Sequence, residues 1–321
     1  MSVPGPTLTI GIPTWNRAEK LRECIERIAP QVEPLAGQVE ILVSDNASPD
    51  ETPEVLASLA ARHPYLRFVR NASNVGADGN YIRLLEAARG RYLWLFGDDD
   101  FIGNDAVMQV LEAIETLRPA LILTNFLYCD SKRQLRHYQV PRRFRAERTV
   151  SGLGLDQTFQ RANHWISFIS RLVFRVDAVD IEDLRKRGQL FQYWTQVYAV
   201  AQVAKATHDV CLLASDAVWC RVGEGRDHPE AFYNGMPKAF QAILADAGAA
   251  QETKDIVARQ IRKDVLPVRI YALFRQRGAK DLPKVPIYYR VCYALFGRAI
   301  VFAWKLYRFV KGRGFGIPPL Y

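Results

Sequence analysis

Residues 92–100 read Tyr-Leu-Trp-Leu-Phe-Gly-Asp-Asp-Asp, an apolar run that ends in three consecutive carboxylates. Five large apolar residues in succession are typical of a strand buried on both faces, as in a parallel sheet. The acids would then lie at the carboxyl edge of the sheet, where open α/β sheets bind ligands. Adjacent carboxylates favour a cation between them, and oxygen ligands suit Mg²⁺ or Mn²⁺ shared with substrate phosphates. Alternatively, the acids cap a helix that starts near Asn104 and Asp105.

The first 130 residues alternate predicted strands and helices, which indicates an α/β fold with a mostly parallel sheet flanked by helices. The predicted strands are 8–12, 39–44, 66–69, 92–96 and 120–127, and the predicted helices are 18–28, 55–61, 81–88 and 106–117. Later, strands are expected at 171–176 and 210–213, with helices near 177–187, 190–205 and 251–275. We therefore expect a domain over 1–250, divided into halves 1–130 and 131–250, and a helical C-terminal region over 251–321.

The composition is that of a globular protein, with 49% hydrophobic and 24% charged residues in a chain of 321. Five cysteines without CxxC spacing favour reduced thiols over a disulfide framework or a zinc site. Those reduced thiols favour a cytosolic setting. Residues 1–6 lack the basic and apolar regions of a signal peptide, so none is expected there. Neither GxGxxG after the first strand nor GxxxxGK[ST] occurs, so a dinucleotide fold and a P-loop NTPase are unsupported.

The net charge of +9 is concentrated in two segments. Residues 282–321 carry seven Lys or Arg and no acid, and residues 131–148 carry seven against one acid. Over 285–310 the cations share one side of a predicted helix that is otherwise apolar and aromatic, which is typical of a segment in the interface of an anionic membrane. The residues expected to contact the membrane are Arg290, Arg298, Trp304, Lys305 and Arg308. The alternative is a helix that packs on the rest of the protein.

Polar loops follow four predicted strands, at 13–17, 45–50, 71–80 and 97–100, and such loops converge on one edge of a sheet. The motifs are TIGIPTWNR at 9–17, ILVSDNASPD at 41–50, NASNVG at 71–76 and GDDD at 97–100. Together they resemble the GT-A glycosyltransferases of family 2, over about the first 130 residues. Within that family the arrangement looks most like bacterial O-antigen and polysaccharide sugar transferases, including the abequosyltransferase-like branch.

The resemblance implies a Rossmann-like GT-A fold and an inverting, metal-dependent transfer of a sugar from a nucleotide-sugar. It also implies that Asp45 binds the nucleoside and that the acidic cluster is the family's DxD motif, with Mn²⁺ or Mg²⁺ on Asp98, Asp99 or Asp100. A literal DxD uses Asp98 and Asp100, whereas alignment of the trailing residues favours Asp99, and both registers remain open. The residues that the resemblance assigns to the nucleotide-sugar are Pro13, Thr14, Asn16, Arg17, Asp45, Asn74, Gly76, Asp78 and Asp98.

An inverting transfer also needs a carboxylate that takes the proton of the acceptor hydroxyl. The candidates for this base are Asp180, Glu182, Asp183, Glu224 and Asp227. The Glu182-Asp183 pair follows its preceding strand sooner than the Glu-Asp pair of the resembling family does. A solvated helix face is the alternative for both residues.

The cationic segments favour a polyprenyl-diphosphate-linked glycan acceptor at the inner face of the cytoplasmic membrane, where anionic lipid attracts them. A nucleotidyltransferase is one alternative, although it would want a Gly-rich loop where this chain has Pro13-Thr14-Trp15-Asn16. A nucleic-acid-binding protein is another, prompted by the pI of about 9.3. Because no helix-turn-helix, RNP or zinc motif is visible, we expect no nucleic-acid partner. The sequence therefore predicts a peripheral membrane glycosyltransferase of surface polysaccharide biosynthesis.

Overall fold

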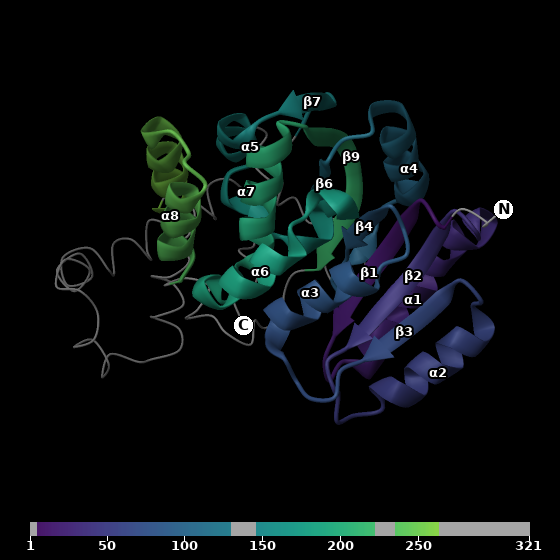
Figure 1. Cartoon of the computed structure of the whole chain (residues 1–321). Helices are drawn as coiled ribbons and strands as arrows, with labels where there is room; N and C mark the ends of the chain where they lie inside the picture. The colour runs from purple at the N-terminus through teal and green to yellow at the C-terminus, as the bar shows by residue number, and fades with distance from the viewer. Residues whose placement is uncertain (1–4, 130–145, 222–234, 263–321) are drawn as a thin grey trace, which may run out of the picture.

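The computed structural model describes residues 5–129, 146–221 and 235–262, in which helices cover both faces of one sheet (Figure 1). The strands are β1 (Leu8–Thr14), β2 (Val39–Asp45), β3 (Leu66–Arg70), β4 (Tyr92–Leu95), β5 (Phe101–Ile102), β6 (Leu121–Cys129), β7 (Val150–Leu153), β8 (Leu172–Arg175) and β9 (Val210–Arg221). The helices are α1 (Ala18–Val32), α2 (Thr52–Arg62), α3 (Gly76–Ala87), α4 (Ala106–Leu117), α5 (Leu155–Ala162), α6 (Ile181–Gly188), α7 (Thr195–Thr207) and α8 (Met236–Asp246). Residues 251–262 are also helical.

The sheet has the strand order β3-β2-β1-β4-β8-β6-β9-β5, and β7 pairs with β9. The first four strands of this order are mutually parallel, as predicted. β8, however, runs antiparallel to both of its neighbours, β4 and β6, and β5 and β7 run antiparallel to β9. The expectation of a mostly parallel sheet is therefore right for the N-terminal half and wrong for the whole sheet, which is mixed.

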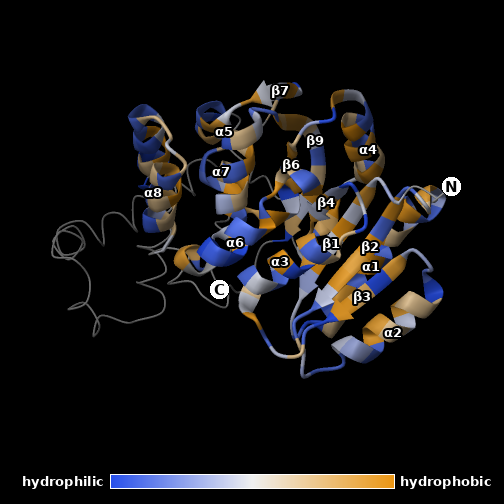
Figure 2. Cartoon of the chain, in the orientation of Figure 1, coloured by the Kyte–Doolittle hydropathy of each residue, from blue (hydrophilic) through white to orange (hydrophobic). Residues whose placement is uncertain are grey.

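β4 shows why the apolar run at 92–96 is buried on both faces. Leu93 and Leu95 belong to the hydrophobic cluster that also contains residues of α3 and α7, whereas Trp94 and Phe96 belong to the cluster formed with α1 and α4. All four side chains are at most 1% exposed. Figure 2 shows the same arrangement as strands in the hydrophobic colour between mixed helices. Burial of each such side chain contributes about 1.5–3 kcal/mol, and it fixes the strand that carries the acids.

Several element boundaries differ from the predictions. The helix at 106–117 matches α4, but β1 continues through Pro13, which lies opposite Ser44, to Thr14. The sequence pattern does not predict β5, β7, α5 or α8. Of the predicted helix 251–275, residues 251–262 are helical, and their Val257 and Ile261 are buried in the core.

The predicted membrane contacts at Arg290, Arg298, Trp304, Lys305 and Arg308 lie outside the described residues. Within the described ranges, no helix combines the length and the apolar character needed to cross a membrane.

Candidate active site

The first loop and the acidic loop meet where the parallel strands β1 and β4 end. Thr14, the last residue of β1, donates its hydroxyl hydrogen to Oδ2 of Asp98 at 2.8 Å. A single nitrogen of Arg17, Nη1, donates to Oδ1 of Asp98 at 3.0 Å and to Oδ2 of Asp99 at 2.9 Å. The side chain of Asp98 is 7% exposed and that of Asp99 is 36% exposed. Two carboxylates, one buried and one open to solvent, therefore converge on one cationic nitrogen.

Asp100 is held by the second half of the chain. Its Oδ2 accepts the hydroxyl hydrogen of Ser170, and its Oδ1 accepts the backbone N–H of Arg221 at 3.3 Å. The Ser170 hydroxyl oxygen in turn accepts the N–H of Gly97 at 2.9 Å. A Cβ atom at Gly97 would lie only 2.9 Å from Oδ2 of Asp100, so a larger residue there would push this carboxylate out of its position. Asp100 is thus a buried support of the acidic loop, whereas Asp99 is its open carboxylate.

The negative charge of this cluster is only partly balanced. Burial and the charge of Asp99 raise the pKa of Asp98 to about 6, although Arg17 opposes that shift. Burial and Asp99 also raise the pKa of Asp100. An added positive charge would favour the ionised form of both carboxyls, so the cluster is suited to binding a cation.

The alternative role of the acids as a helix cap is not what the structure shows. The N-cap of α4 is Asp105, which has a left-handed φ of 51° and makes no side-chain capping hydrogen bond. Asp98, Asp99 and Asp100 instead bond to the partners given above. The three acids are therefore part of the loop cluster and not of the α4 N-terminus.

Asp45 ends β2 beneath the second loop and is fully buried. Its Oδ1 accepts the N–H of Ser48 at 3.0 Å, and its Oδ2 lies 3.2 Å from Nη1 of Arg70 but accepts no hydrogen bond. The hydroxyl oxygen of Ser48 accepts the N–H of Asn16 at 2.8 Å, which ties the second loop to the first. Asn16 has a left-handed φ of 56°, which asparagine tolerates. Asp45 thus retains an oxygen with unused hydrogen-bonding capacity.

Asn46 joins the second loop to the third. Its Nδ2 donates to Oδ1 of Asn74 at 2.9 Å and to the carbonyl oxygen of Gly76 at 3.2 Å. Its Oδ1 accepts hydrogen bonds from Nδ2 of Asn71 and from the N–H of Val75, each at 3.0 Å. Gly76 has a φ of 77°, a conformation that favours glycine. The structure therefore brings the predicted residues Asn74 and Gly76 beside the loop that follows Asp45.

Asp78 has contacts that the sequence did not predict. Its two carboxylate oxygens accept the N–H groups of Tyr193, at 2.6 Å, and Thr195, at 3.3 Å, where α7 begins. Burial raises the pKa of Asp78, although these hydrogen bonds oppose the shift. Asp78 therefore fastens the start of α3 to the start of α7, and its contact with a nucleotide stays a prediction.

The base candidates after β8 do not join the cluster. Because β8 is antiparallel to β4, its last residue, Arg175, lies opposite Tyr92 at the edge away from the acids. Of the candidates, Asp180 accepts the N–H of Asp183 at the start of α6, and Asp183 accepts the hydroxyl hydrogen of Tyr198 at 2.6 Å.

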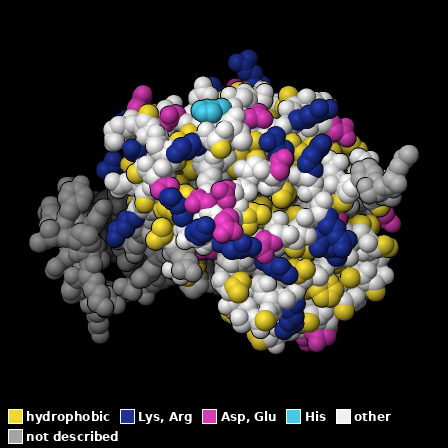
Figure 3. Space-filling model, viewed as in Figure 1, with side chains coloured by type: hydrophobic (Ala, Val, Ile, Leu, Met, Phe, Trp, Pro, Cys, Tyr) yellow, Lys and Arg dark blue, Asp and Glu magenta, His cyan; other side chains and the backbone are white. Residues whose placement is uncertain are grey.

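The third candidate, Glu182, forms ion pairs with Arg185 and Lys186 of its own helix. Arg185 also pairs with Glu86 of α3. Figure 3 shows acidic and basic side chains side by side over α3 and α6. None of these bonds links Asp180, Glu182 or Asp183 to the acidic cluster, so their role as the base stays a prediction. The side chain of Glu182 is exposed, as the solvated-face alternative expects. Glu224 and Asp227 lie outside the described residues.

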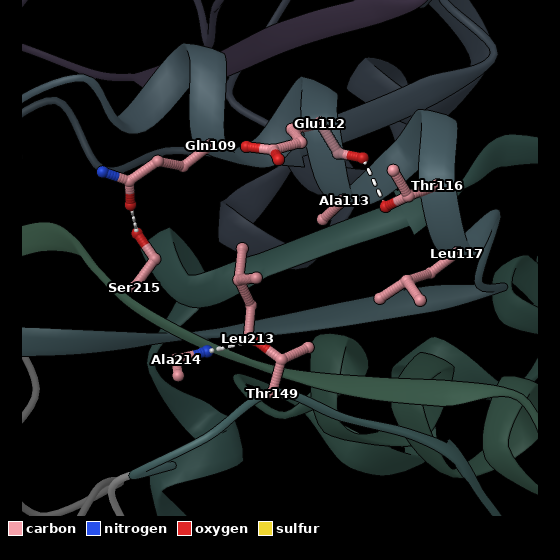
Figure 4. Close-up of a pocket in the computed structure, with 9 residues that line it drawn as sticks. All are labelled: Gln109, Glu112, Ala113, Thr116, Leu117, Thr149, Leu213, Ala214 and Ser215. Atoms are coloured by element: carbon pink, nitrogen blue, oxygen red, sulfur yellow. Dashed lines mark hydrogen bonds between the residues drawn. The ribbon is translucent and has the colours of Figure 1, made fainter.

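A hollow of about 300 Å³ lies between α4 and β9 (Figure 4). The hydroxyl of Ser215 donates to Gln109 across it, and Glu112 is its single ionisable lining residue. No lining residue in the described ranges bonds to the acidic cluster. The hollow is therefore separate from the candidate site.

Three residues near the acids carry no recognisable signal in the sequence. Ser170 and Arg221 reach Asp100 from distant parts of the chain, as given above. The guanidinium of Arg221 also pairs with Glu23 at 2.7 Å. The pKa of Tyr81 is raised by burial and by the nearby charges of Asp78, Asp98 and Asp99, which places its hydroxyl in electrostatic range of the cluster. Only the folded chain brings these residues together.

The fold and these loops define an α/β protein with a polar, acidic site at the carboxyl edge of its parallel strands. The family model described as "Glycosyl transferase family 2" matches residues 9–170, which is half of the chain. The chain belongs to glycosyl transferase family 2. This confirms the predicted family and favours glycosyl transfer over the nucleotidyltransferase and nucleic-acid-binding alternatives.

A curated relative is the abequosyltransferase RfbV of Salmonella typhimurium, which is 37% identical over 97 residues, or 30% of this chain and 29% of the relative. The match thus spans less than a third of that protein. TarS of S. aureus in complex with UDP-GlcNAc superposes with a TM-score of 0.59 at 16% identity, covering 86% of this chain and 78% of that one. The mannosyltransferase PcManGT of Pyrobaculum calidifontis, in complex with GDP-Man and Mn²⁺, superposes with a TM-score of 0.59 at 17% identity, covering 94% of this chain and 81% of that one. These two likenesses show the fold.

Proposed function

We propose that this protein is an inverting, metal-dependent glycosyltransferase that moves a sugar from a nucleotide-sugar to a glycan acceptor. The observation that carries the proposal is the convergence of Asp98 and Asp99 on one cationic nitrogen of Arg17. This convergence joins the loop that follows β1 to the loop that follows β4, at the edge where open α/β sheets bind ligands.

The residues present fit a divalent cation. Their ligand atoms are carboxylate oxygens, which suit Mg²⁺ or Mn²⁺. Burial and the neighbouring charge of Asp99 raise the pKa values of Asp98 and Asp100, so a further positive charge would stabilise the ionised forms of both carboxyls. The described residues contain no group of three or more acidic, histidine or cysteine side chains that could hold a metal. That agrees with an ion that takes one or two carboxylates and completes its shell with substrate phosphates.

Asp99 is the metal ligand that this geometry supports best, with Asp98 beside it. Its carboxylate is the open one, whereas Asp100 is occupied by Ser170 and the Arg221 backbone. This supports the register that centres on Asp99 over the literal one that uses Asp100. A bound divalent ion would act as a Lewis acid that stabilises the departing nucleoside diphosphate.

The chain's own residues would bind and orient the donor. Arg17, released from one carboxylate, can pair with a phosphate oxygen, because its guanidinium has several donors. Oδ2 of Asp45 can accept an N–H of the base or a ribose hydroxyl hydrogen, since no described residue donates to it. Pro13, Thr14, Asn74 and Gly76 border the same loops and would shape the nucleotide pocket.

For the acceptor side, we propose Asp227 or Glu224 as the base, because an inverting transfer needs a carboxylate that accepts the acceptor's proton. A polyprenyl-diphosphate-linked glycan is the acceptor class that the cationic segments favour. Arg290, Arg298, Lys305 and Arg308 would hold the enzyme on the inner face of the membrane, with Trp304 as an apolar anchor.

The experiment that tests this function is a screen of nucleotide-sugars for hydrolysis and for thermal stabilisation, with Mn²⁺ or Mg²⁺ and with excess EDTA. We expect at least one donor to be cleaved with the metal and to be stable with EDTA. A screen in which no donor binds or reacts, or in which EDTA has no effect, contradicts the proposal.

A further inference from the structure

Arg171 is a buried guanidinium that has no anionic partner among the described residues. It is 2% exposed, its Nε donates to the carbonyl oxygen of Thr124 at 3.0 Å, and its guanidinium lies 5.8 Å from the ring of Phe126. Its Nη1 is buried and donates no hydrogen bond, and no carboxylate of the described chain pairs with it. Burial alone lowers the pKa of Arg171, to about 10. In contrast, the guanidinium of the similarly buried Arg221 is paired with Glu23.

A buried charge without a counter-ion is costly, because the protein interior solvates ions poorly. With a pKa of about 10, Arg171 remains charged at neutral pH. The free energy lost on burying it is recovered when an anion binds beside it. The position of Arg171 is therefore that of a ligand-binding residue, and packing alone does not explain a cation there.

Arg171 lies at the same edge of the sheet as the acidic cluster. It immediately precedes β8, which enters the sheet from that edge because it runs antiparallel to β4. The preceding residue, Ser170, bonds to Asp100 on the side of β4, whereas the Arg171 side chain bonds to Thr124 of β6 on the other side. In the sheet, β8 lies between β4, whose loop carries the predicted metal site, and β6, which Arg171 contacts.

In the part of the chain that the structure describes, two further buried hydrogen-bond donors near Arg171 have no acceptor. These are the hydroxyl of Thr124, whose carbonyl accepts from Arg171, and Nε1 of Trp165, whose ring centroid is 5.7 Å from that of Phe126. A ligand with several acceptor oxygens would satisfy them together. Phosphate has this property, and guanidinium binds it strongly in a bidentate way.

We propose that Arg171 binds a phosphate group of a substrate, in a subsite that it forms with Thr124 and Trp165 beside the acidic cluster. The identity of the substrate rests on the proposed function. The phosphate belongs either to the diphosphate of the nucleotide-sugar or to that of a lipid-diphosphate-linked acceptor. The position on the β6 side of β8 favours the acceptor.

The test is the binding of inorganic diphosphate to the full-length protein, measured by calorimetry and by thermal shift. Arg171→Met removes the charge and keeps an unbranched side chain, Arg171→Lys keeps the charge, and Arg175→Met is the control at the opposite edge. We expect Arg171→Met to melt cooperatively at the wild-type temperature or above, because a buried unpaired charge is removed. We expect its affinity for diphosphate to fall at least ten-fold, with Arg171→Lys between it and the wild type.

UDP and GDP, each with Mn²⁺, separate the two sources of the phosphate. If Arg171→Met binds these nucleotides as the wild type does, the subsite serves the acceptor; if it loses them too, the subsite serves the donor. Equal diphosphate affinity of Arg171→Met and wild type, or a lower melting temperature with unchanged binding, would overturn the inference. Donor hydrolysis by the wild type reports the proposed function separately, since diphosphate binding does not depend on it.

Discussion

Ser170 donates its hydroxyl hydrogen to Oδ2 of Asp100, a residue 70 positions earlier in the chain. The same hydroxyl oxygen accepts the N–H of Gly97, so one side chain fixes both ends of the acidic turn. The turn that presents Asp98 and Asp99 is therefore held in place by the segment that precedes β8. The geometry of the predicted metal site depends on both halves of the chain.

Ser170→Ala should destabilise the protein by about 1–3 kcal/mol, because it leaves the N–H of Gly97 and a carboxyl oxygen of Asp100 buried without partners. Chemical denaturation measures this change, and Ser151→Ala, at an exposed position of β7, is the matched control. If Ser170→Ala lowers the free energy of unfolding by no more than Ser151→Ala does, water replaces the hydroxyl of Ser170.

Asp99→Asn should reduce Mn²⁺ binding in the presence of a nucleoside diphosphate by at least ten-fold, while stability changes by no more than about 0.5 kcal/mol. The reason is that Asp99 is the open carboxylate of the cluster. Asp100→Ala, by contrast, should cost about 1–3 kcal/mol of stability, since it unpairs Ser170. Asp177→Asn, an exposed acid that follows β8, is the control. Full metal affinity in Asp99→Asn would assign the ion to another ligand.

Asp45→Ala should weaken the binding of a nucleoside diphosphate by about 1.5–3 kcal/mol, the usual contribution of a charge-assisted hydrogen bond. Oδ2 of Asp45, which accepts no hydrogen bond, is the predicted acceptor for the nucleoside. Calorimetry gives the affinity, and Arg70→Gln shows how much of the effect arises from the neighbouring ion pair. Unchanged affinity in Asp45→Ala would remove this residue from the donor site.

The stability of the metal-free protein should depend on pH through Asp98. Its pKa is about 6 in the fold against an ordinary value of 3.8, so the fold favours the protonated form. This contribution is fully present below pH 4 and is lost as the pH rises through 6. The free energy of unfolding of the wild type, relative to Asp98→Asn, should thus fall by on the order of 1–3 kcal/mol between pH 4 and 7. A difference that does not vary with pH contradicts this assignment.

Deletion of residues 284–321 should release the protein from anionic liposomes and reduce transfer to a lipid-linked acceptor. Each cation near an anionic surface contributes about 1 kcal/mol, and this segment has seven. Donor hydrolysis should survive, because the nucleotide loops lie in the first 130 residues. Aggregation of the truncated protein would support the alternative, a helix packed on the domain. Full-length protein that ignores liposomes of any charge would refute the membrane prediction.

The sequence was most informative where one strand and its loop are adjacent in the chain. The run at 92–96 predicted β4 because a short, continuous apolar segment is typical of a strand buried on both faces, and Asp98 and Asp99 follow it directly. The motif at 9–17 likewise placed Thr14 and Arg17 at the end of the first strand. Their hydrogen bonds to Asp98 confirm that these loops converge.

The sequence did not predict whether each strand runs parallel or antiparallel to its neighbours in the sheet. The apolar pattern at 171–176 indicates a strand but does not say whether that strand is parallel to its neighbours, and β8 is reversed. The candidates Asp180, Glu182 and Asp183 thus follow a strand that ends at the edge away from the acids, and their role as the base stays a prediction. Ser170 and Arg171 were missed for the same reason, since a reversed strand brings to the site the residues that precede it.

The hydrogen bonds of Asn46 have a consequence for binding kinetics. They hold residues 71–76 in place before a nucleotide-sugar binds. Ordering a loop costs about 1–2 kcal/mol per residue in backbone entropy. That cost is borne during folding, so it does not slow the encounter with a nucleotide or add the large heat-capacity change of coupled folding. Donor association should then follow a single fast phase. Asn46→Ala, in which the loop must order on binding, should instead show a slower association at a similar final geometry.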